Sequence, residues 1–168
     1  MTGRFSLARH TPVSACQQRL AIEMLLVAPE DDLLLVMRRS ADQPQTRLIG
    51  VVGDDGKLVG VLPILRLAES VVARVAPEAL FADMSDLVDV ARFGHAVEAR
   101  FVKDVMLPSA VVRPEETLDH AFRQMHERHL SGLYVVDADG RPTGYVDLLE
   151  LVLMYVDALE SPPAESPG

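Results

Sequence analysis

The chain has 168 residues, a net charge of −9 and a single cysteine, and its length suffices for one sizeable domain or two small ones that share a core. The negative charge disfavours a nucleic acid partner, and charged residues interrupt every apolar window long enough to cross a membrane. Because the lone Cys16 cannot form an internal disulfide, we expect a cytoplasmic protein.

The first predicted domain covers residues 23–75 and follows a weakly patterned N-terminal extension, residues 1–22. Pro29 holds the preceding residue extended, and the acidic residues after it favour the start of a helix. Two short β-rich runs then flank Asp55-Gly56, the dipeptide that best tolerates the positive φ angles of a hairpin turn. The second run enters an apolar helix over Leu62–Val75. The predicted order is strand, helix, strand, strand, helix.

The same order of elements recurs in residues 102–159, the second predicted domain. Matching positions lie 85 residues apart for Pro29 and Pro114, and 84 residues apart for Gly60 and Gly144. One residue is therefore gained or lost within the repeat, and we expect these pairs to occupy equivalent places in two similar folds.

A helical connector, residues 76–101, joins the two copies, and residues 160–168 form a tail that we expect to be disordered. In the second copy Thr117 is the candidate cap of the first helix. That helix carries an apolar stripe at helical spacing, formed by Leu118, Ala121, Phe122 and Met125. Neither copy alone buries much core, so we expect the two to pack their sheets together into one pseudo-symmetric body.

These motifs resemble the cystathionine-β-synthase-type (CBS) domain. The resemblance covers nearly the whole second copy, in four blocks: Phe101–Met106, Val112–Leu118, Gly132–Arg141 and Gly144–Val146. The first copy is similar from Val27 to about Leu67, but it lacks a clear aspartate-valine-methionine opening. The resemblance implies an α/β fold, namely a tandem CBS pair (Bateman module) of two βαββα units packed pseudo-symmetrically through their sheets.

The same resemblance implies a stand-alone regulatory module rather than an enzyme. Members commonly form homodimers, regulate another protein and hold adenosine compounds such as AMP, ADP or ATP in clefts between the two domains. Apolar helices such as Val146–Leu159 also favour a homodimer, because they carry more apolar residues than one intramolecular face buries. The alternative is a protein–protein interaction or dimerisation scaffold whose ligand clefts have decayed.

In nucleotide-binding members the last hairpin strand runs into Gly-x-x-Ser/Thr-x-x-Asp, whose hydroxyl meets phosphate and whose aspartate accepts hydrogen bonds from the ribose. Asp147 and Glu150 stand at these two positions after Gly144, so Glu150 is a candidate ribose acceptor and Asp147 opposes a phosphate. Acids are also favoured at a helix start, and both interpretations stay open. In the first copy Arg66, with Arg47 nearby, is a candidate phosphate ligand or an ordinary surface residue.

The resemblance further implies that the second cleft is lined by backbone groups of Ser109, Ala110, Leu133 and Val135. Tyr134 stands where these domains often carry proline, and it either narrows the cleft or packs in the core. His126 and His129 share a helix face, but His120 is badly placed to join them, so we expect no metal site. The sequence carries no recognised catalytic motif, and we expect neither enzymatic activity nor a cofactor.

Overall fold

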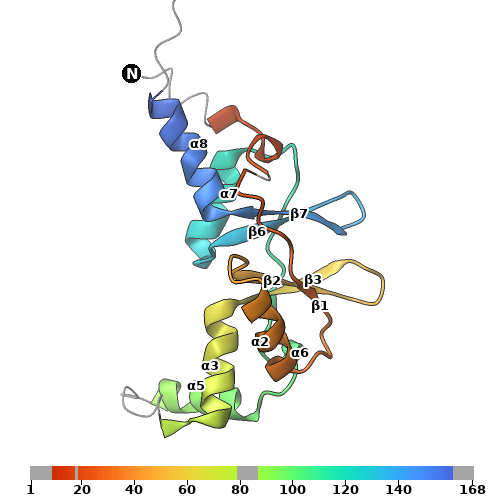
Figure 1. Ribbon diagram of the computed structural model, residues 1–168, viewed down its shortest axis with the longest axis vertical. Coiled ribbons are helices and arrows are strands. Elements are labelled where there is room, and N and C mark those ends of the chain that lie inside the picture. The colour runs from red at the N-terminus through yellow and green to blue at the C-terminus, as the bar shows by residue number, and fades with distance from the viewer. Residues whose placement is uncertain (1–8, 18, 79–86, 161–168) are drawn as a thin grey trace, which may run out of the picture. The chain divides into compact units, whose positions relative to one another are not determined.

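Two β-sheets, each with its own helices, make up the computed structural model, which describes residues 9–17, 19–78 and 87–160 (Figure 1). Contacts group the chain into two units. We call residues 23–109 the repeat 1 unit, and residues 1–22 with 110–168 the repeat 2 unit. Among the described residues, no helix is long and apolar enough to cross a membrane.

The repeat 1 unit has a four-stranded sheet in the order β1-β2-β3-β4. β1 pairs with β2 in parallel, and the other neighbours are antiparallel. Its elements in chain order are β1 (Leu26–Val27), α2 (Leu33–Asp42), β2 (Leu48–Val52), β3 (Leu58–Pro63), α3 (Ile64–Val75), α5 (Leu87–Glu98), α6 (Val102–Val105) and β4 (Leu107–Pro108).

The repeat 2 unit has a three-stranded sheet in the order β5-β6-β7, again with one parallel and one antiparallel pair. Its elements are the short helix η1 (Val13–Ala15), β5 (Val111–Val112), α7 (Leu118–Arg128), β6 (Gly132–Val136), β7 (Pro142–Asp147) and α8 (Leu148–Glu160). Both units therefore contain the predicted order of strand, helix, strand, strand, helix, and the mixed α/β fold is confirmed.

The hairpins confirm the repeat at the level of single residues. Val51 lies opposite Gly60, and Val135 lies opposite Gly144, and in each pair of strands a bulge follows immediately. The turn glycines, Gly56 and Gly140, have φ angles of 77° and 80°, which glycine adopts at little cost. The two Asp-Gly turns were thus correctly predicted.

Local caps fix the starts of the first helices in both repeats. Thr117 accepts a hydrogen bond from the His120 amide at 3.3 Å, as predicted for the cap of α7. Asp32, the equivalent residue 85 positions earlier, accepts from the Leu34 amide at 2.8 Å at the start of α2. Each cap satisfies an amide that the helix itself leaves unpaired.

The opening segments of the two repeats are exchanged between the units. In the second opening segment, residues 100–106, the Val102 amide donates to the Asp31 carbonyl at 3.0 Å within the repeat 1 unit. In the first opening segment, residues 11–17, the Val13 amide donates to the Glu116 carbonyl at 2.8 Å within the repeat 2 unit. Residues 11–17 therefore supply the opening that the first repeat lacked in the sequence comparison.

The units do not follow the repeat boundaries drawn from the sequence, because each takes its opening segment from the other repeat. The described part of the 1–22 extension belongs with the second repeat, and residues 102–109 belong with the first. The predicted 76–101 connector contains α5, which packs against α3. The predicted disordered tail, except for Glu160 at the end of α8, falls outside the described residues.

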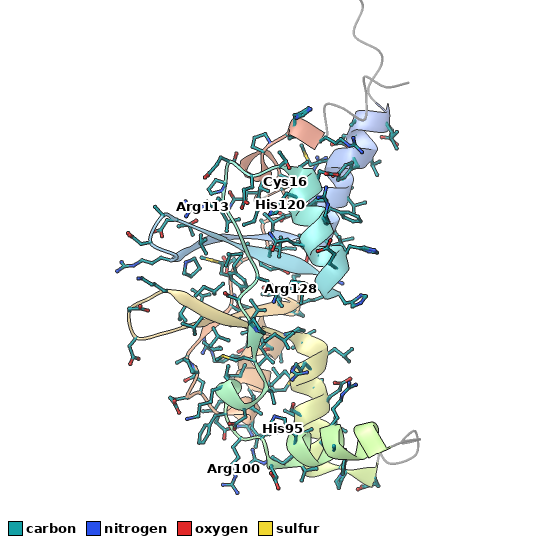
Figure 2. All side chains as sticks on the ribbon, turned by 180° about the vertical axis from the view of Figure 1, so that it is seen from behind. Cys16, His95, Arg100, Arg113, His120 and Arg128 are labelled. Carbon is teal, nitrogen blue, oxygen red and sulfur yellow. The ribbon has the colours of Figure 1, made fainter. Side chains whose placement is uncertain are left out.

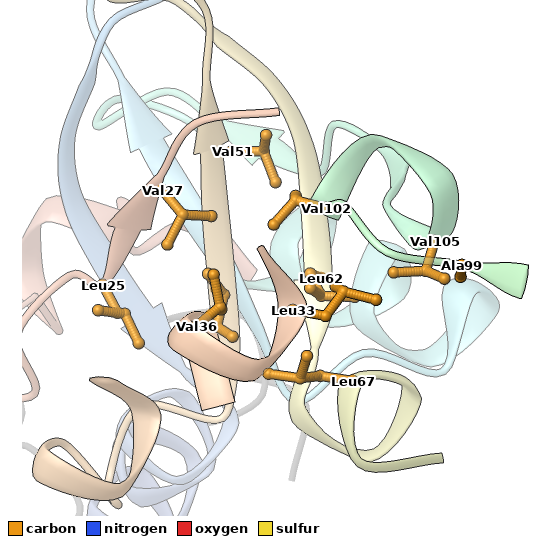
Figure 3. Packing of buried hydrophobic residues seen from close by; sticks show 11 residues of the cluster. Leu25, Val27, Leu33, Val36, Val51, Leu62, Leu67, Ala99, Val102 and Val105 are labelled. Carbon is orange, nitrogen blue, oxygen red and sulfur yellow. The ribbon is translucent and has the colours of Figure 1, made fainter. Parts of the chain in front are cut away.

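The core of the repeat 1 unit shows what the exchanged segment contributes. Side chains from the sheet, α2, α3 and the chain around α6 meet in one buried cluster (Figure 3). Its members are Leu25, Val27, Leu33, Val36, Ile49, Val51, Leu62, Leu67, Ala99, Val102 and Val105. The last three belong to the second repeat by sequence or to the end of the connector, so the first repeat completes its core only with them.

Candidate ligand-binding elements

The start of α8 holds the two acids predicted from the sequence. Asp147 immediately precedes the helix, and its Oδ1 accepts from the Leu149 amide at 2.9 Å. Glu150 reaches back, and its Oε2 accepts from the Asp147 amide at 3.0 Å. This arrangement resembles a capping box, except that Asp147 accepts from the second helical amide and not the third, and it satisfies amides that the helix leaves unpaired. Both acids therefore serve as helix-start residues, one of the two predicted alternatives, while their contact with a ligand stays a prediction.

Glu150 has a second function that the sequence did not indicate. Its other oxygen, Oε1, accepts from the Leu20 amide at 2.9 Å, and the residue is only 1% exposed. The carboxylate therefore fastens the chain just beyond the first opening segment to the start of α8. Tyr145 adds a bond from its hydroxyl to Oδ2 of Asp147 at 3.3 Å, so this buried group of acids is held by several donors.

Arg66 occupies the equivalent position in repeat 1, and the charge is reversed. It is the third residue of α3, and its Nε donates to the Val105 carbonyl in the second opening segment. A side chain at the start of the post-hairpin helix thus holds the exchanged opening segment in the repeat 1 unit, where Arg66 donates, and the chain just beyond that segment in the repeat 2 unit, where Glu150 accepts. Arg47 is exposed, and its carbonyl accepts from the Ile64 amide at 2.9 Å at the start of α3.

The predicted strand residues lie together in the repeat 2 unit, apart from Ser109. Ala110, Leu133, Tyr134 and Val135 are all 0% exposed, and the Tyr134 amide donates to the Ala110 carbonyl at 3.1 Å. The ring of Tyr134 packs against the ring of Tyr145, with 5.4 Å between centroids. Tyr134 is therefore a core packing residue. Ser109 is half-buried and is the last residue of the repeat 1 unit.

Two glycines at equivalent positions allow the opening segments to approach the sheets. A Cβ added at Gly60 would lie 2.8 Å from the Leu107 carbonyl oxygen and 2.9 Å from the Met106 sulfur. A Cβ added at Gly144 would collide with the end of the Gln17 side chain. Met106 and Gln17 are the corresponding last residues of the two opening segments. The glycines could be matched from sequence, but nothing in the weakly patterned N-terminal stretch predicted what covers them.

Cys16 lies buried at the end of the first opening segment, where its Sγ donates to the Val13 carbonyl at 3.2 Å (Figure 2). Burial raises the pKa of the Cys16 thiol to about 11, and the negative charge of Glu150 adds to the rise. A thiol with this pKa stays protonated at neutral pH and is a poor nucleophile.

The histidines have structural contacts of their own. His120 lies 3.3 Å from a Glu116 oxygen and 3.0 Å from the Gln124 side chain. His129 ends α7 in the left-handed conformation, with a φ of 53°. Within the described residues, no three histidine, cysteine or acidic side chains are grouped as metal ligands.

Comparison with solved structures defines the class of fold. A CBS-domain-containing protein from Thermotoga maritima superposes with a TM-score of 0.72 at 21% identity, covering 90% of this chain and 99% of the other. CBSX2 from Arabidopsis thaliana gives 0.62 at 21% identity, covering 90% and 98%. The CBS domain pair of protein MJ0100 gives 0.63 at 15% identity, covering 88% and 97%. The chain has the fold of a CBS domain pair.

The sequence identifies one of the two domains directly. Residues 102–157 match the family model of the CBS domain, so the second repeat is a CBS domain. No curated protein sequence matches the chain. The first repeat is recognised by its fold and by the register that it shares with the second.

Proposed function

We propose that this CBS pair is a regulatory module that senses an adenosine nucleotide or nucleoside. The observation that carries the proposal is that both repeats contain a complete βαββα unit and that the chain shares its fold with CBS pairs solved with such ligands. CBSX2 was solved with AMP, and the MJ0100 pair with 5′-methylthioadenosine and S-adenosylmethionine. Adenosine is the part that these three ligands share, which favours the adenosine moiety as the group that is recognised.

In this proposal the ligand prefers the repeat 2 unit, with Glu150 as ribose acceptor and the backbone near Ala110 and Leu133 as further contacts. A carboxylate has about four lone-pair positions, and two of them already accept from the Leu20 and Asp147 amides. A ribose hydroxyl therefore either donates to Glu150 alongside the Leu20 amide or takes the place of that amide. Asp147 adds negative charge, which favours a nucleoside over a triphosphate.

A thermal-shift titration with adenosine, AMP, ADP, ATP and S-adenosylmethionine tests the proposal, with GMP as the control. A ligand that binds only the folded protein raises the melting temperature in step with RT ln(1 + [L]/Kd). We expect stabilisation by at least one adenosine compound, without release of products in a chromatographic assay. If no adenosine compound raises the melting temperature above the GMP control, the proposal fails, and turnover of the ligand would indicate an enzyme.

Variants locate the site by calorimetry. Glu150→Gln should weaken the ligand about ten- to a hundredfold, because an amide offers one acceptor oxygen where a carboxylate offers two. Glu160→Gln on the same helix is the control. Arg66→Ala should have a smaller effect, and a larger one would move the site to Arg66 and Arg47 in the repeat 1 unit. Asp147→Ser should favour phosphorylated ligands, because it removes a repulsive charge and supplies a hydroxyl.

A second candidate function, an interaction or homodimerisation scaffold, is favoured by the apolar surface of α8. Leu149 and Leu159 are 55% and 53% exposed on this helix, and exposed apolar patches of this kind mark interaction sites. A scaffold without ligand binding would show a stable oligomer in sedimentation and no response in the thermal-shift titration. The two candidate functions therefore make different predictions for the same pair of experiments.

A further inference from the structure

The chain itself covers both ends of the Gly144–Glu150 stretch to which the ligand is assigned. At one end, Oε1 of Glu150 accepts from the Leu20 amide at 2.9 Å, and Glu150 is only 1% exposed. At the other end, a Cβ added at Gly144 would lie 2.2 Å from Nε2 of Gln17, so the Gln17 side chain lies directly against this glycine. The residues that follow η1 therefore occupy the surface on which a ribose would meet Glu150.

Four described residues after η1 make these contacts, and we call them the latch: Cys16, Gln17, Arg19 and Leu20. The latch reaches α8 through side chains. Arg19 forms a salt bridge with Asp157 and contacts the sulfur of Met154. The Leu20 amide ends on the Glu150 carboxylate. Contacts of this kind can be exchanged one at a time.

The equivalent stretch of the first repeat is held differently. After the second opening segment the chain enters β4, where Leu107 and Pro108 pair with β3. The described latch residues form no strand, and β7 is the last strand of its sheet within the described part of the repeat 2 unit. Opening the latch therefore breaks no strand pair, whereas opening its counterpart would separate β4 from β3.

The chain before the latch is anchored by its backbone. The Val13 amide donates to the Glu116 carbonyl at 2.8 Å, and the Ser14 amide donates to the Pro114 carbonyl at 3.0 Å. The side chain of Val13 is 0% exposed. These contacts involve neither β7 nor α8, so the latch can leave Glu150 while the segment before it stays bound.

The residue after the latch is in an unfavourable conformation. Ala21 has a φ of 50°, in the left-handed region where the Cβ of an L-residue meets the following carbonyl oxygen. Such strain persists only while surrounding contacts impose it. Release of Leu20 from Glu150 allows Ala21 to return to an ordinary conformation, and this relief offsets part of the cost of opening.

Cys16 makes the opening measurable. It is the only cysteine of the chain, it is 0% exposed, and its Sγ donates to the Val13 carbonyl at 3.2 Å. A buried thiol reacts with an alkylating reagent only when the structure around it opens. When opening is fast compared with alkylation, the rate of alkylation is proportional to the open fraction.

We propose that the latch is autoinhibitory: closed, it commits Glu150 to the Leu20 amide, and an adenosine compound binds the repeat 2 unit only when the latch opens. The inference rests on the proposed function and specifies that the ribose hydroxyl takes the place of the Leu20 amide. The apparent affinity then falls in proportion to the fraction of open molecules. A change that loosens the latch should therefore raise the adenosine affinity and the alkylation rate of Cys16 by the same factor.

Two variants of the full chain test this proposal. Arg19→Ala removes the salt bridge between the latch and α8, and Arg123→Ala removes a comparable salt bridge to Asp119 within α7. We expect Arg19→Ala to raise the rate of Cys16 alkylation by N-ethylmaleimide about two- to fivefold, the effect of losing one exposed ion pair. Calorimetry should show an equal rise in adenosine affinity. Arg123→Ala should change neither quantity, and the melting temperature checks that both variants fold.

The results of this comparison decide the role of the latch. An unchanged alkylation rate in Arg19→Ala overturns the latch. An equal rise in both variants also overturns it, because a general loss of stability then exposes Cys16. Faster alkylation without a higher adenosine affinity shows that the latch does not compete with the ligand, and the autoinhibition fails.

Hydrogen exchange of the Leu20 amide, measured by NMR with saturating adenosine, separates this proposal from the proposed function. We expect bound adenosine to speed the exchange, because the ribose takes the acceptor of this amide. Unchanged or slower exchange with adenosine bound overturns the autoinhibition and leaves the proposed function standing. If no adenosine compound binds either wild type or Arg19→Ala, the proposed function fails and the autoinhibition fails with it.

Discussion

Arg66 and Glu150 each hold a backbone segment by a hydrogen bond, although their side chains carry opposite charges. Arg66 donates to the Val105 carbonyl, and Glu150 accepts from the Leu20 amide, so in both units the third residue of the post-hairpin helix holds a segment brought from the other repeat. A carboxylate at this position pairs with an amide, and a guanidinium pairs with a carbonyl. The departure from the family motif at both positions therefore has a structural explanation that applies even without a ligand.

Glu150→Gln should consequently destabilise the ligand-free protein. The Leu20 and Asp147 backbone amides each donate to one oxygen of Glu150. Glutamine has only one side-chain oxygen, so its NH₂ group faces one of these two donors and cannot accept from it. The buried amide left without an acceptor should lower the free energy of unfolding by about 1.5–3 kcal/mol. Urea unfolding of the variant, compared with Glu160→Gln on the exposed end of α8, measures this loss. Equal unfolding midpoints for the two variants would show that the contact with Leu20 contributes nothing to stability.

Cys16 should make stability fall at alkaline pH. Its pKa is about 11 in the folded protein and 9.0 for an ordinary thiol, so between these values the folded chain keeps a proton that the unfolded chain releases. Stability present below about pH 9 is therefore lost as the pH rises toward 11. Urea unfolding at about pH 8 and about pH 10 should show a larger decline for wild type than for Cys16→Ala. The same decline in both proteins would rule out this effect.

At the scale of elements, local signals were sufficient for the helices and hairpins but not for the exchanged segments. Thr117 and the two Asp-Gly turns act on amides or backbone angles within a few residues, so sequence alone located α7 and both hairpins. The first opening segment is short and carries no strong periodicity, and it packs on strands more than a hundred residues later. Leu20 and Gln17 therefore could not be recognised as partners of Glu150 and Gly144.

The exchanged segments predict different effects for two equivalent glycine substitutions. In Gly60→Ala the new methyl group meets the Leu107 carbonyl, which belongs to a paired strand and cannot move without breaking β4. In Gly144→Ala the methyl group meets only the end of the flexible Gln17 side chain. We expect Gly60→Ala to lower the free energy of unfolding by about 1–3 kcal/mol, and Gly144→Ala to have a smaller effect.

Urea unfolding of the two alanine variants measures this difference, and a second substitution in each tests its cause. Gln17→Ala should rescue Gly144→Ala, because it removes the group that the methyl meets. Met106→Ala should not rescue Gly60→Ala, because the Leu107 carbonyl remains. An equal loss of unfolding free energy for both glycine substitutions would mean that close contact with the opening segments is not the reason why these positions carry glycine.

At the scale of the whole molecule, the boundaries of the sequence repeats do not coincide with the boundaries of the two units. Repeat periodicity identifies residues 23–75 as the first domain, yet the buried cluster of the repeat 1 unit also takes Ala99, Val102 and Val105. The pairing of the two sheets expected from pseudo-symmetry stays a prediction. What the described residues establish is that neither repeat completes its own unit without the opening of the other.

This division predicts which fragments fold. Residues 23–109 contain every member of the buried cluster and all four strands of the sheet, so this fragment should unfold cooperatively in urea. Residues 23–98 retain the complete strand-helix-strand-strand-helix order and α5, but they lack Ala99, Val102, Val105 and β4. Removing three buried side chains and one strand costs more than the few kcal/mol by which a domain of this size is stable. The shorter fragment should therefore show no cooperative transition, and cooperative unfolding of both fragments with similar midpoints would mean that the first repeat folds without the exchanged segment.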